Sequence, residues 1–142
     1  IDEIAAGGGS GLAKLRKLIV SYAEMMTTDY GKSLVRFDVR DLSEDNRKII
    51  QASKRKIDRA FRAYIKDGIA DGSIRPCDVK LAAFAIAGSL NWIGHWYQPG
   101  GALPGEAIAR EFAGHLTEGI AARQPGSKAK KPPGSAKRGG KR

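Results

Sequence analysis

Apolar residues recur along most of the chain at the spacing of α-helices, and they are densest between Cys77 and Tyr97. At 100° per residue, this stretch carries two apolar stripes that lie about 120° apart. The first stripe consists of Val79, Ala82, Ala83, Ile86, Leu90, Ile93 and Tyr97, and the second of Leu81, Ala85, Trp92 and Trp96. An outer helix of a compact monomer usually buries one such face. The pattern therefore predicts a central helix with a core on one side and a partner on the other.

The same periodicity predicts three more helices, each with one apolar side. They cover, in order, residues 11–30, about 43–72 and 104–123. The second of these is long, and its opposite side carries mostly Arg and Lys. Residues 31–42 are too short and too mixed for a firm assignment, and we expect a short helix or a turn there. The predicted fold class is all-α, a bundle of about five helices.

Residues with a preference for helix ends support these bounds. Ser10, Ser43 and Asp78 each stand just before a predicted helix, where a side-chain oxygen can accept a hydrogen bond from a free backbone N–H. Gly72 and Pro76 end the long helix, and the run QPGG at residues 98–101 ends the central one.

The positive charge of the chain is concentrated at its C-terminal end. The whole chain has a net charge of +10, but residues 124–142 contain seven basic residues and no acid. These residues are Lys128, Lys130, Lys131, Lys137, Arg138, Lys141 and Arg142. The same segment has no apolar residue larger than Ala, so we expect a disordered tail. Such a tail either contacts nucleic acid without sequence preference or only improves solubility.

Few residues are available for chemistry. Cys77 is the only cysteine, and His95 and His115 are the only histidines, so the sequence predicts no disulfide and no metal site. The run GGGSG at residues 7–11 follows no predicted strand and is not a phosphate loop. We expect neither enzyme activity nor a cofactor. An export signal and a membrane span are not predicted either, which favours the cytoplasm.

Two stretches resemble the C-terminal half of TetR-family transcriptional repressors. They are GIADGSIRPCDVKLAA at residues 68–83 and NWIGHWYQPGGALPGEAIAREFAGHLTEGI at residues 91–120. The resemblance implies an effector-binding and dimerisation domain over residues 12–123, with the last two long helices forming a four-helix bundle in a homodimer. It also implies a helix-turn-helix of about fifty residues before residue 1, which would contact DNA. Residues 1–11 would then be a flexible remnant of the link to it.

The aromatic and polar side chains of the central helix suggest where an effector binds, since ligand sites are mostly apolar with a few polar groups. We predict a pocket lined by Tyr22, Met25, Met26, Phe61, Tyr64, Ile65, Asn91, Trp92, His95 and Trp96. For the two tryptophans, packing in the core is the alternative. The predicted dimer interface consists of Ile86, Leu90, Ile108, Phe112, Leu116 and Ile120.

The expected effector is a hydrophobic small molecule. The class of this molecule is open. By analogy with relatives that have a similar WY-P-G turn, an acyl-CoA thioester is one candidate, and its charged head group would then meet arginines of the long helix. The main alternative is a small helical protein that associates with nucleic acid through its basic tail. A helical enzyme or carrier is a third alternative, but the sequence contains no catalytic constellation for it. Salt-dependent binding to any DNA duplex would favour the nucleic-acid-associated protein. Thermal stabilisation by one apolar compound would favour the ligand-sensing domain.

Overall fold

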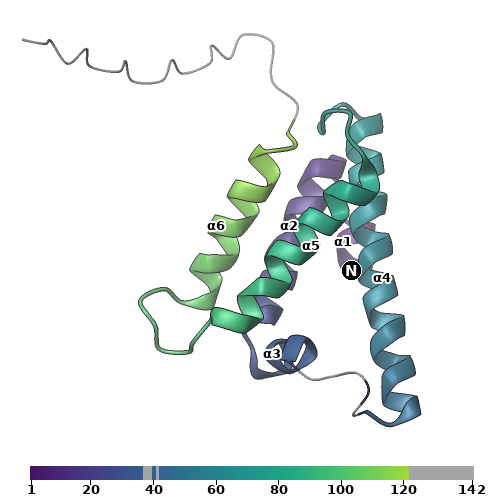
Figure 1. The fold of residues 1–142 in the computed structure, drawn as a ribbon. Coiled ribbons are helices and arrows are strands. Elements are labelled where there is room, and N and C mark those ends of the chain that lie inside the picture. Colours follow the sequence, from purple (N-terminus) through teal and green to yellow (C-terminus); the bar gives the residue numbers. More distant parts are fainter. Residues whose placement is uncertain (37–39, 41, 122–142) are drawn as a thin grey trace, which may run out of the picture.

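The computed structural model describes residues 1–36, 40 and 42–121, and this part of the chain forms six helices (Figure 1). The helices are α1 (Asp2–Ala6), α2 (Gly11–Met26), α3 (Asp29–Arg36), α4 (Glu44–Ala70), α5 (Val79–Trp96) and α6 (Gly105–Glu118). The only β-type pairing in the described residues is an isolated antiparallel bridge between Ile74 and Ala121. The prediction of an all-α fold is therefore confirmed.

The helix predicted over residues 11–30 is in fact two helices, because α2 ends at Met26. The hydroxyl groups of Thr27 and Thr28 donate to the carbonyl oxygens of Glu24 and Met25, both at 2.7 Å, and so compete with the backbone bonds that would extend the helix. The Thr28 hydroxyl also accepts a hydrogen bond from the backbone N–H of Gly31. The chain turns at these threonines and begins α3, which lies partly in the segment predicted as a short helix or turn.

The three predicted capping residues do cap helices. The side chains of Ser10, Ser43 and Asp78 accept hydrogen bonds from the backbone N–H groups three residues later, at 3.2, 3.4 and 2.9 Å. These bonds satisfy N–H groups that have no partner within the helix.

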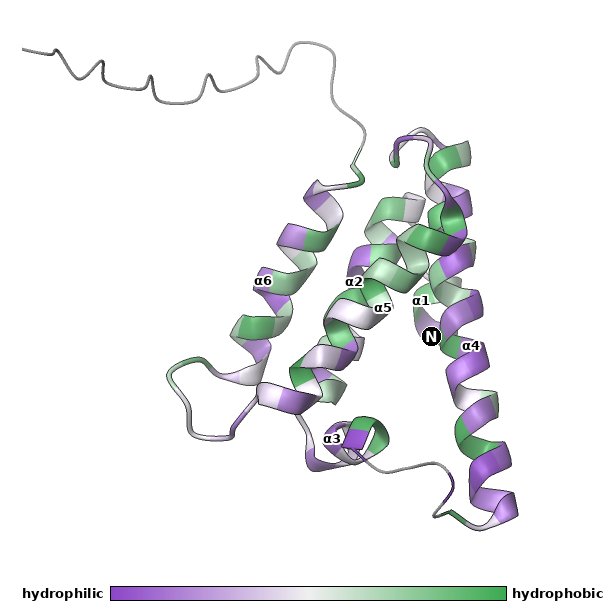
Figure 2. Ribbon diagram, viewed as in Figure 1, coloured by the Kyte–Doolittle hydropathy of each residue, from purple (hydrophilic) through white to green (hydrophobic). Residues whose placement is uncertain are grey.

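Helix α2 occupies the middle of the fold, with α4, α5 and α6 around it (Figure 1). Its side chains Leu15, Ile19 and Met26 are fully buried, together with Phe61 and Ile65 of α4. Most of the length of α4 is hydrophilic (Figure 2), in agreement with the basic side predicted for it. The core therefore lies along α2, and α4 exposes a charged surface.

The N-terminus of α2 is tied to the C-terminal end of α4. A Cβ atom on Gly11 would lie 2.0 Å from the backbone nitrogen of Gly68, so the two helices touch through their backbones. Asp71 Oδ2 accepts a hydrogen bond from the N–H of Gly11 at 2.6 Å. Hydrogen bonds from the side chain of Ser73, and then from the backbone amides of Gly11 and Ser73, lower the pKa of Asp71. Towards the other end of α4 the two helices diverge, and α3 lies in that region (Figure 1).

Helix α5 has the two faces that its sequence predicts. Ala83, Ile86, Leu90 and Ile93 of the first stripe are buried in the core. The second stripe is exposed: Leu81, Trp92 and Trp96 retain 64%, 62% and 44% of their accessible surface. Extended apolar patches on a protein surface often mark interaction sites.

Candidate functional site

A cavity of about 440 Å³ lies between α2, α3, α4 and α5. Most of the wall area is apolar, and seven of the thirteen lining residues carry a polar side-chain group. The lining residues are Tyr22, Tyr30, Leu34, Val35, Ile50, Ser53, Lys54, Ile57, Asp58, Phe61, Ala87, Asn91 and His95. This combination of shape and chemistry is typical of small-molecule sites, which enclose about 300–1,000 Å³.

The structure brings four of the ten predicted pocket residues together around this cavity. They are Tyr22, Phe61, Asn91 and His95. The rings of Tyr22 and Phe61 meet edge to face, with 6.0 Å between their centroids and 87° between their planes. Phe61 is fully buried and marks the inner end, whereas Ser53 and Lys54 are exposed and mark the mouth.

The other six predicted pocket residues lie outside the cavity lining. Met26, Tyr64 and Ile65 are buried in the core, and Met25 packs against it, because these side chains project to other sides of α2 and α4. Trp92 and Trp96 are exposed and belong to the outer face of α5, since Trp92 is rotated by about 100° from Asn91. Neither tryptophan lines this cavity, and neither is packed in the core.

Sequence reasoning missed nine of the lining residues. Ile50 and Ile57 lie on the apolar side of the long helix, and the helical pattern does not distinguish a cavity wall from a packed core. Leu34 and Val35 are apolar and have to pack against other apolar residues. Residues 31–42 show no periodicity that would indicate against which helix they pack. The position of α3 beside α5 decided that these side chains form a wall of the cavity.

The inner part of the cavity contains one polar pair. The hydroxyl of Tyr22 on α2 donates a hydrogen bond of 2.7 Å to Oδ1 of Asn91 on α5. Burial raises the pKa of the Tyr22 hydroxyl, so the group stays protonated and remains a donor at neutral pH. At the mouth, Asp58 pairs with Arg62 at 2.9 Å, which leaves Lys54 as the basic group that lines the cavity.

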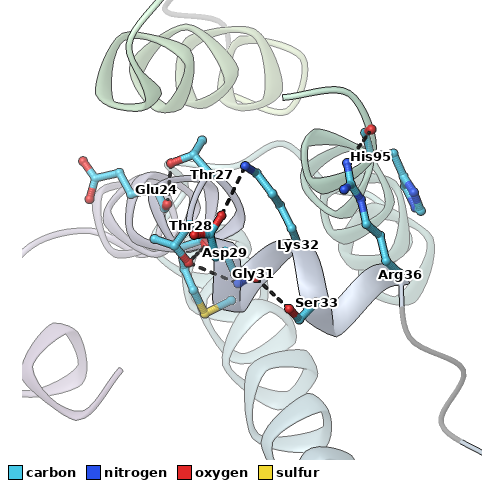
Figure 3. A network of polar contacts seen from close by, with 10 residues as sticks. Glu24, Thr27, Thr28, Asp29, Gly31, Lys32, Ser33, Arg36 and His95 are labelled. Carbon is cyan, nitrogen blue, oxygen red and sulfur yellow. Dashed lines mark hydrogen bonds and ion pairs between the residues drawn. The ribbon is translucent and has the colours of Figure 1, made fainter. Parts of the chain in front are cut away.

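Polar contacts hold α3 against the C-terminal end of α5 (Figure 3). Lys32 is buried, with its Nζ 5.3 Å from the centroid of the Tyr97 ring and 3.6 Å from Oδ1 of Asp29. Arg36 Nη2 donates to the backbone carbonyl oxygen of His95 at 3.2 Å. Cations are stabilised near a helix C-terminus, where carbonyl oxygens lack partners. The basic residues of α3 thus fasten one wall of the cavity to α5.

Two glycines allow this close packing of α3. A Cβ atom on Gly94 of α5 would lie 2.6 Å from Cγ2 of Val35, and one on Gly31 would lie 2.1 Å from the carbonyl oxygen of Met25. Neither distance is compatible with a side chain at these positions. Because Val35 lines the cavity, the shape of this wall depends on the absence of a side chain at residue 94.

Comparison with known families identifies the domain. Residues 8–120 match the model of the family described as "Tetracyclin repressor-like, C-terminal domain". The chain belongs to this TetR C-terminal domain family. The predicted resemblance is confirmed, and the all-helical arrangement around α2 is the TetR C-terminal fold.

Individual relatives agree with the family assignment. The HTH-type transcriptional repressor KstR2 of Rhodococcus jostii (strain RHA1) is 25% identical over 123 residues, which are 84% of this chain and 60% of the relative. The chain thus spans about three fifths of the length of this repressor.

Solved structures share the fold of this TetR-family domain. The ketosteroid transcriptional regulator KstR2 of Mycobacterium tuberculosis has a TM-score of 0.74 at 20% identity, covering 86% of this chain and 64% of that one. AibR, solved in complex with isovaleryl coenzyme A and operator DNA, has a TM-score of 0.68 at 24% identity, covering 82% and 63%. At this level of identity the likeness concerns the fold alone.

The predicted dimer interface of the TetR-family domain needs a correction. Ile86, Leu90 and Ile108 are enclosed by their own chain, so they cannot form a surface for a second copy. Phe112, Leu116 and Ile120 are half-buried against the core. The exposed α5 face, which we define as Leu81, Phe84, Trp92 and Trp96, was not part of the predicted interface. It continues onto α6, because the Trp96 and Phe112 rings stack with centroids 6.4 Å apart.

Other predictions concern features that the described residues only partly include. The seven basic residues predicted to contact nucleic acid lie outside the described residues. Within the described part of the chain, no group of three or more His, Cys, Asp or Glu side chains could hold a metal ion. None of the described helices is both long and apolar enough to cross a membrane.

Proposed function

We propose that this domain senses a hydrophobic small molecule and forms the dimer of a TetR-like transcriptional repressor. In this proposal, the effector controls DNA binding by a helix-turn-helix domain outside these 142 residues. The observation that carries the proposal is the cavity, which four helices enclose and whose wall area is mostly apolar. Family membership supports it, because the matched family is the C-terminal half of tetracyclin repressor-like proteins.

The proposed effector is of the acyl-CoA type. The cavity volume of about 440 Å³ is in the lower half of the usual range for ligand sites, so it would enclose an acyl chain but not a whole coenzyme A. The charged part of the molecule would then extend past the mouth, where Lys54 lies. AibR, which has the same fold, was solved with isovaleryl coenzyme A, and this supports the choice of ligand class.

The proposed homodimer uses the exposed α5 face and the adjoining surface of α6. Four large apolar side chains on one side of a single helix form an extended apolar patch, and soluble monomers rarely leave such patches uncovered. A twofold arrangement would place the face of one protomer on the same face of the other. Phe112, Leu116 and Ile120 remain as predicted interface residues at the edge of this patch.

Helix α3 supplies a physical route from effector to dimer in this proposal. Tyr30, Leu34 and Val35 of α3 line the cavity, and Arg36 binds the C-terminal end of α5. A ligand with different affinities for two positions of α3 would shift the population between them. Because α5 also carries the proposed dimer face, the shift would change how the protomers are placed.

A matched pair of variants tests the site. Ile50 lines the cavity, whereas its neighbour Ile49 is 63% exposed and does not. Calorimetric titration with acyl-CoA thioesters of increasing chain length should show saturable binding to the wild type and to Ile49→Trp. The variant Ile50→Trp fills the cavity and should not bind, although its melting temperature stays close to that of the wild type. The proposal fails if no acyl-CoA and no apolar compound binds, or if both variants bind equally well.

A further inference from the structure

The polar pair in the inner part of the cavity points to the chemistry of the enclosed end of the effector. We infer that Asn91, oriented by Tyr22, selects effectors that carry a carbonyl oxygen within the cavity. This inference rests on the proposed function, since it assumes that the cavity binds the effector. It goes beyond that proposal by naming the atom that is recognised and the residue that recognises it.

The hydrogen bond between α2 and α5 determines which atoms of Asn91 remain available. The Tyr22 hydroxyl donates to Oδ1 at 2.7 Å, so the carbonyl side of the amide is occupied. The Nδ2 group has two N–H donors. Among the residues that the structure describes, no protein group accepts a hydrogen bond from it. The pair can therefore offer a ligand the N–H donors of Asn91 Nδ2.

The surroundings make this donor selective. Phe61 and Ala87 line the same cavity, and the Phe61 ring packs edge-on against Tyr22. The other polar lining groups are not part of this pair. Tyr30, Ser53 and Lys54 are exposed, and Asp58 pairs with Arg62. The ring of His95 lies 5.0 Å from that of exposed Trp92. A ligand that displaces water from Nδ2 without offering an acceptor leaves a polar group unpaired in an apolar site, which is costly. A ketone on the enclosed part of the acyl chain supplies the acceptor, whereas a plain alkyl chain does not.

Tyr22 acts as a positioning residue. An asparagine side chain can present either its oxygen or its nitrogen to a cavity by rotating half a turn. In the structure Oδ1 lies towards the Tyr22 hydroxyl, and this arrangement leaves Nδ2 for the ligand. Removing the hydroxyl should leave apolar binding intact but weaken the preference for a carbonyl. If Tyr22 had a purely structural role, its removal would change the affinities for ligands with and without a carbonyl by the same factor.

The test compares two probes that differ in one group. 7-Oxooctanoyl-CoA carries a ketone near the far end of its acyl chain, and octanoyl-CoA has a methylene in its place. We expect the wild type to bind 7-oxooctanoyl-CoA about tenfold more tightly, as one hydrogen bond in a shielded site provides. The variant Asn91→Leu has a similar volume without polar atoms and should bind the two probes equally. Tyr22→Phe should show an intermediate ratio.

Further variants distinguish recognition from folding. Asn91→Asp keeps the size of the side chain but replaces the N–H donors with an oxygen, and it should reverse the preference towards octanoyl-CoA. Asn46 is the other asparagine of the chain and is exposed at the start of α4, so Asn46→Leu should retain the wild-type ratio. Melting temperatures of all variants show which of them are folded, and affinity ratios of folded variants are independent of small changes in stability.

The outcomes separate the inference from the proposed function. Equal affinity of the wild type for both probes overturns the carbonyl selection and leaves the proposed function standing. A carbonyl preference that persists in folded Asn91→Leu and Asn91→Asp also overturns it. If neither probe binds the wild type, the inference fails together with the acyl-CoA part of the proposed function. A preference that Asn91→Leu abolishes and Asn46→Leu retains supports the inference.

Discussion

Trp92 provides a sharp test of the proposed dimer. It is 62% exposed in the single chain, on the outer side of α5, and contributes little to the core. Replacing it with Ala should therefore leave the fold of a protomer intact. If the α5 face is the dimer interface, the same replacement removes apolar surface that the partner covers. Trp92→Ala should thus weaken association while it preserves helical content.

The size of the effect follows from the exposed area. An aromatic side chain buries about 150–250 Å² when it is fully enclosed. Because 62% of Trp92 is still exposed, roughly 90–150 Å² remain for a partner to cover. At about 25 cal/mol per Å², this area corresponds to roughly 2–4 kcal/mol in each protomer. A twofold interface contains the residue twice, so even the lower value predicts a dissociation constant about a thousandfold higher.

Sedimentation velocity over a wide dilution series measures this change directly. The wild type should sediment as a dimer at concentrations where Trp92→Ala is already a monomer. Ile49→Ala serves as the control, because Ile49 is 63% exposed but belongs to α4 and not to the α5 face. The reasoning is refuted if Trp92→Ala dimerises as tightly as the wild type, or if Ile49→Ala weakens the dimer by the same factor.

Three further predictions address the cavity, the fold and the tail. Gly94→Val should displace α3, because its Cβ would meet Val35 at 2.6 Å. The variant should melt at a lower temperature and bind acyl-CoA at least tenfold more weakly by calorimetry, whereas Gly114→Val, which has open space, should bind normally. The pKa of Asp71 is lower in the folded state than in the unfolded state, where it is about 3.9. The ionised carboxylate therefore stabilises the fold above this pH, and the stabilisation is lost as the pH falls through the folded pKa. Melting temperatures of the wild type should fall more steeply below pH 4 than those of Asp71→Asn. Truncation after Gln124 should leave the melting temperature unchanged, because the removed segment has no apolar residue larger than Ala; a clear decrease in a thermal melt would show that the tail packs on the domain.

The sequence alone determined the four long helices α2, α4, α5 and α6, most of their ends, and the family, but not the short helices α1 and α3. Helix starts depend on local hydrogen bonds, such as the one that Asp78 accepts from the N–H of Leu81. Because donor and acceptor are only three residues apart, the local sequence is enough to predict such a start. The second apolar face of α5 was also visible, because helical periodicity places Trp92 and Trp96 on one side whatever the rest of the chain does. The turn motifs around residues 68–83 and 91–120 led to the correct family.

The tertiary structure alone decided which apolar residues enclose a cavity and which form the core. Phe61 and Ile65 are one helical turn apart and equally apolar, yet the first lines the cavity and the second is packed solid. The difference depends on the angle between α2 and α4, which touch at Gly11 and Gly68 and diverge towards α3. Periodicity gives the direction of a side chain from its own helix axis, but the distance to the neighbouring helix is set by contacts between residues far apart in the chain.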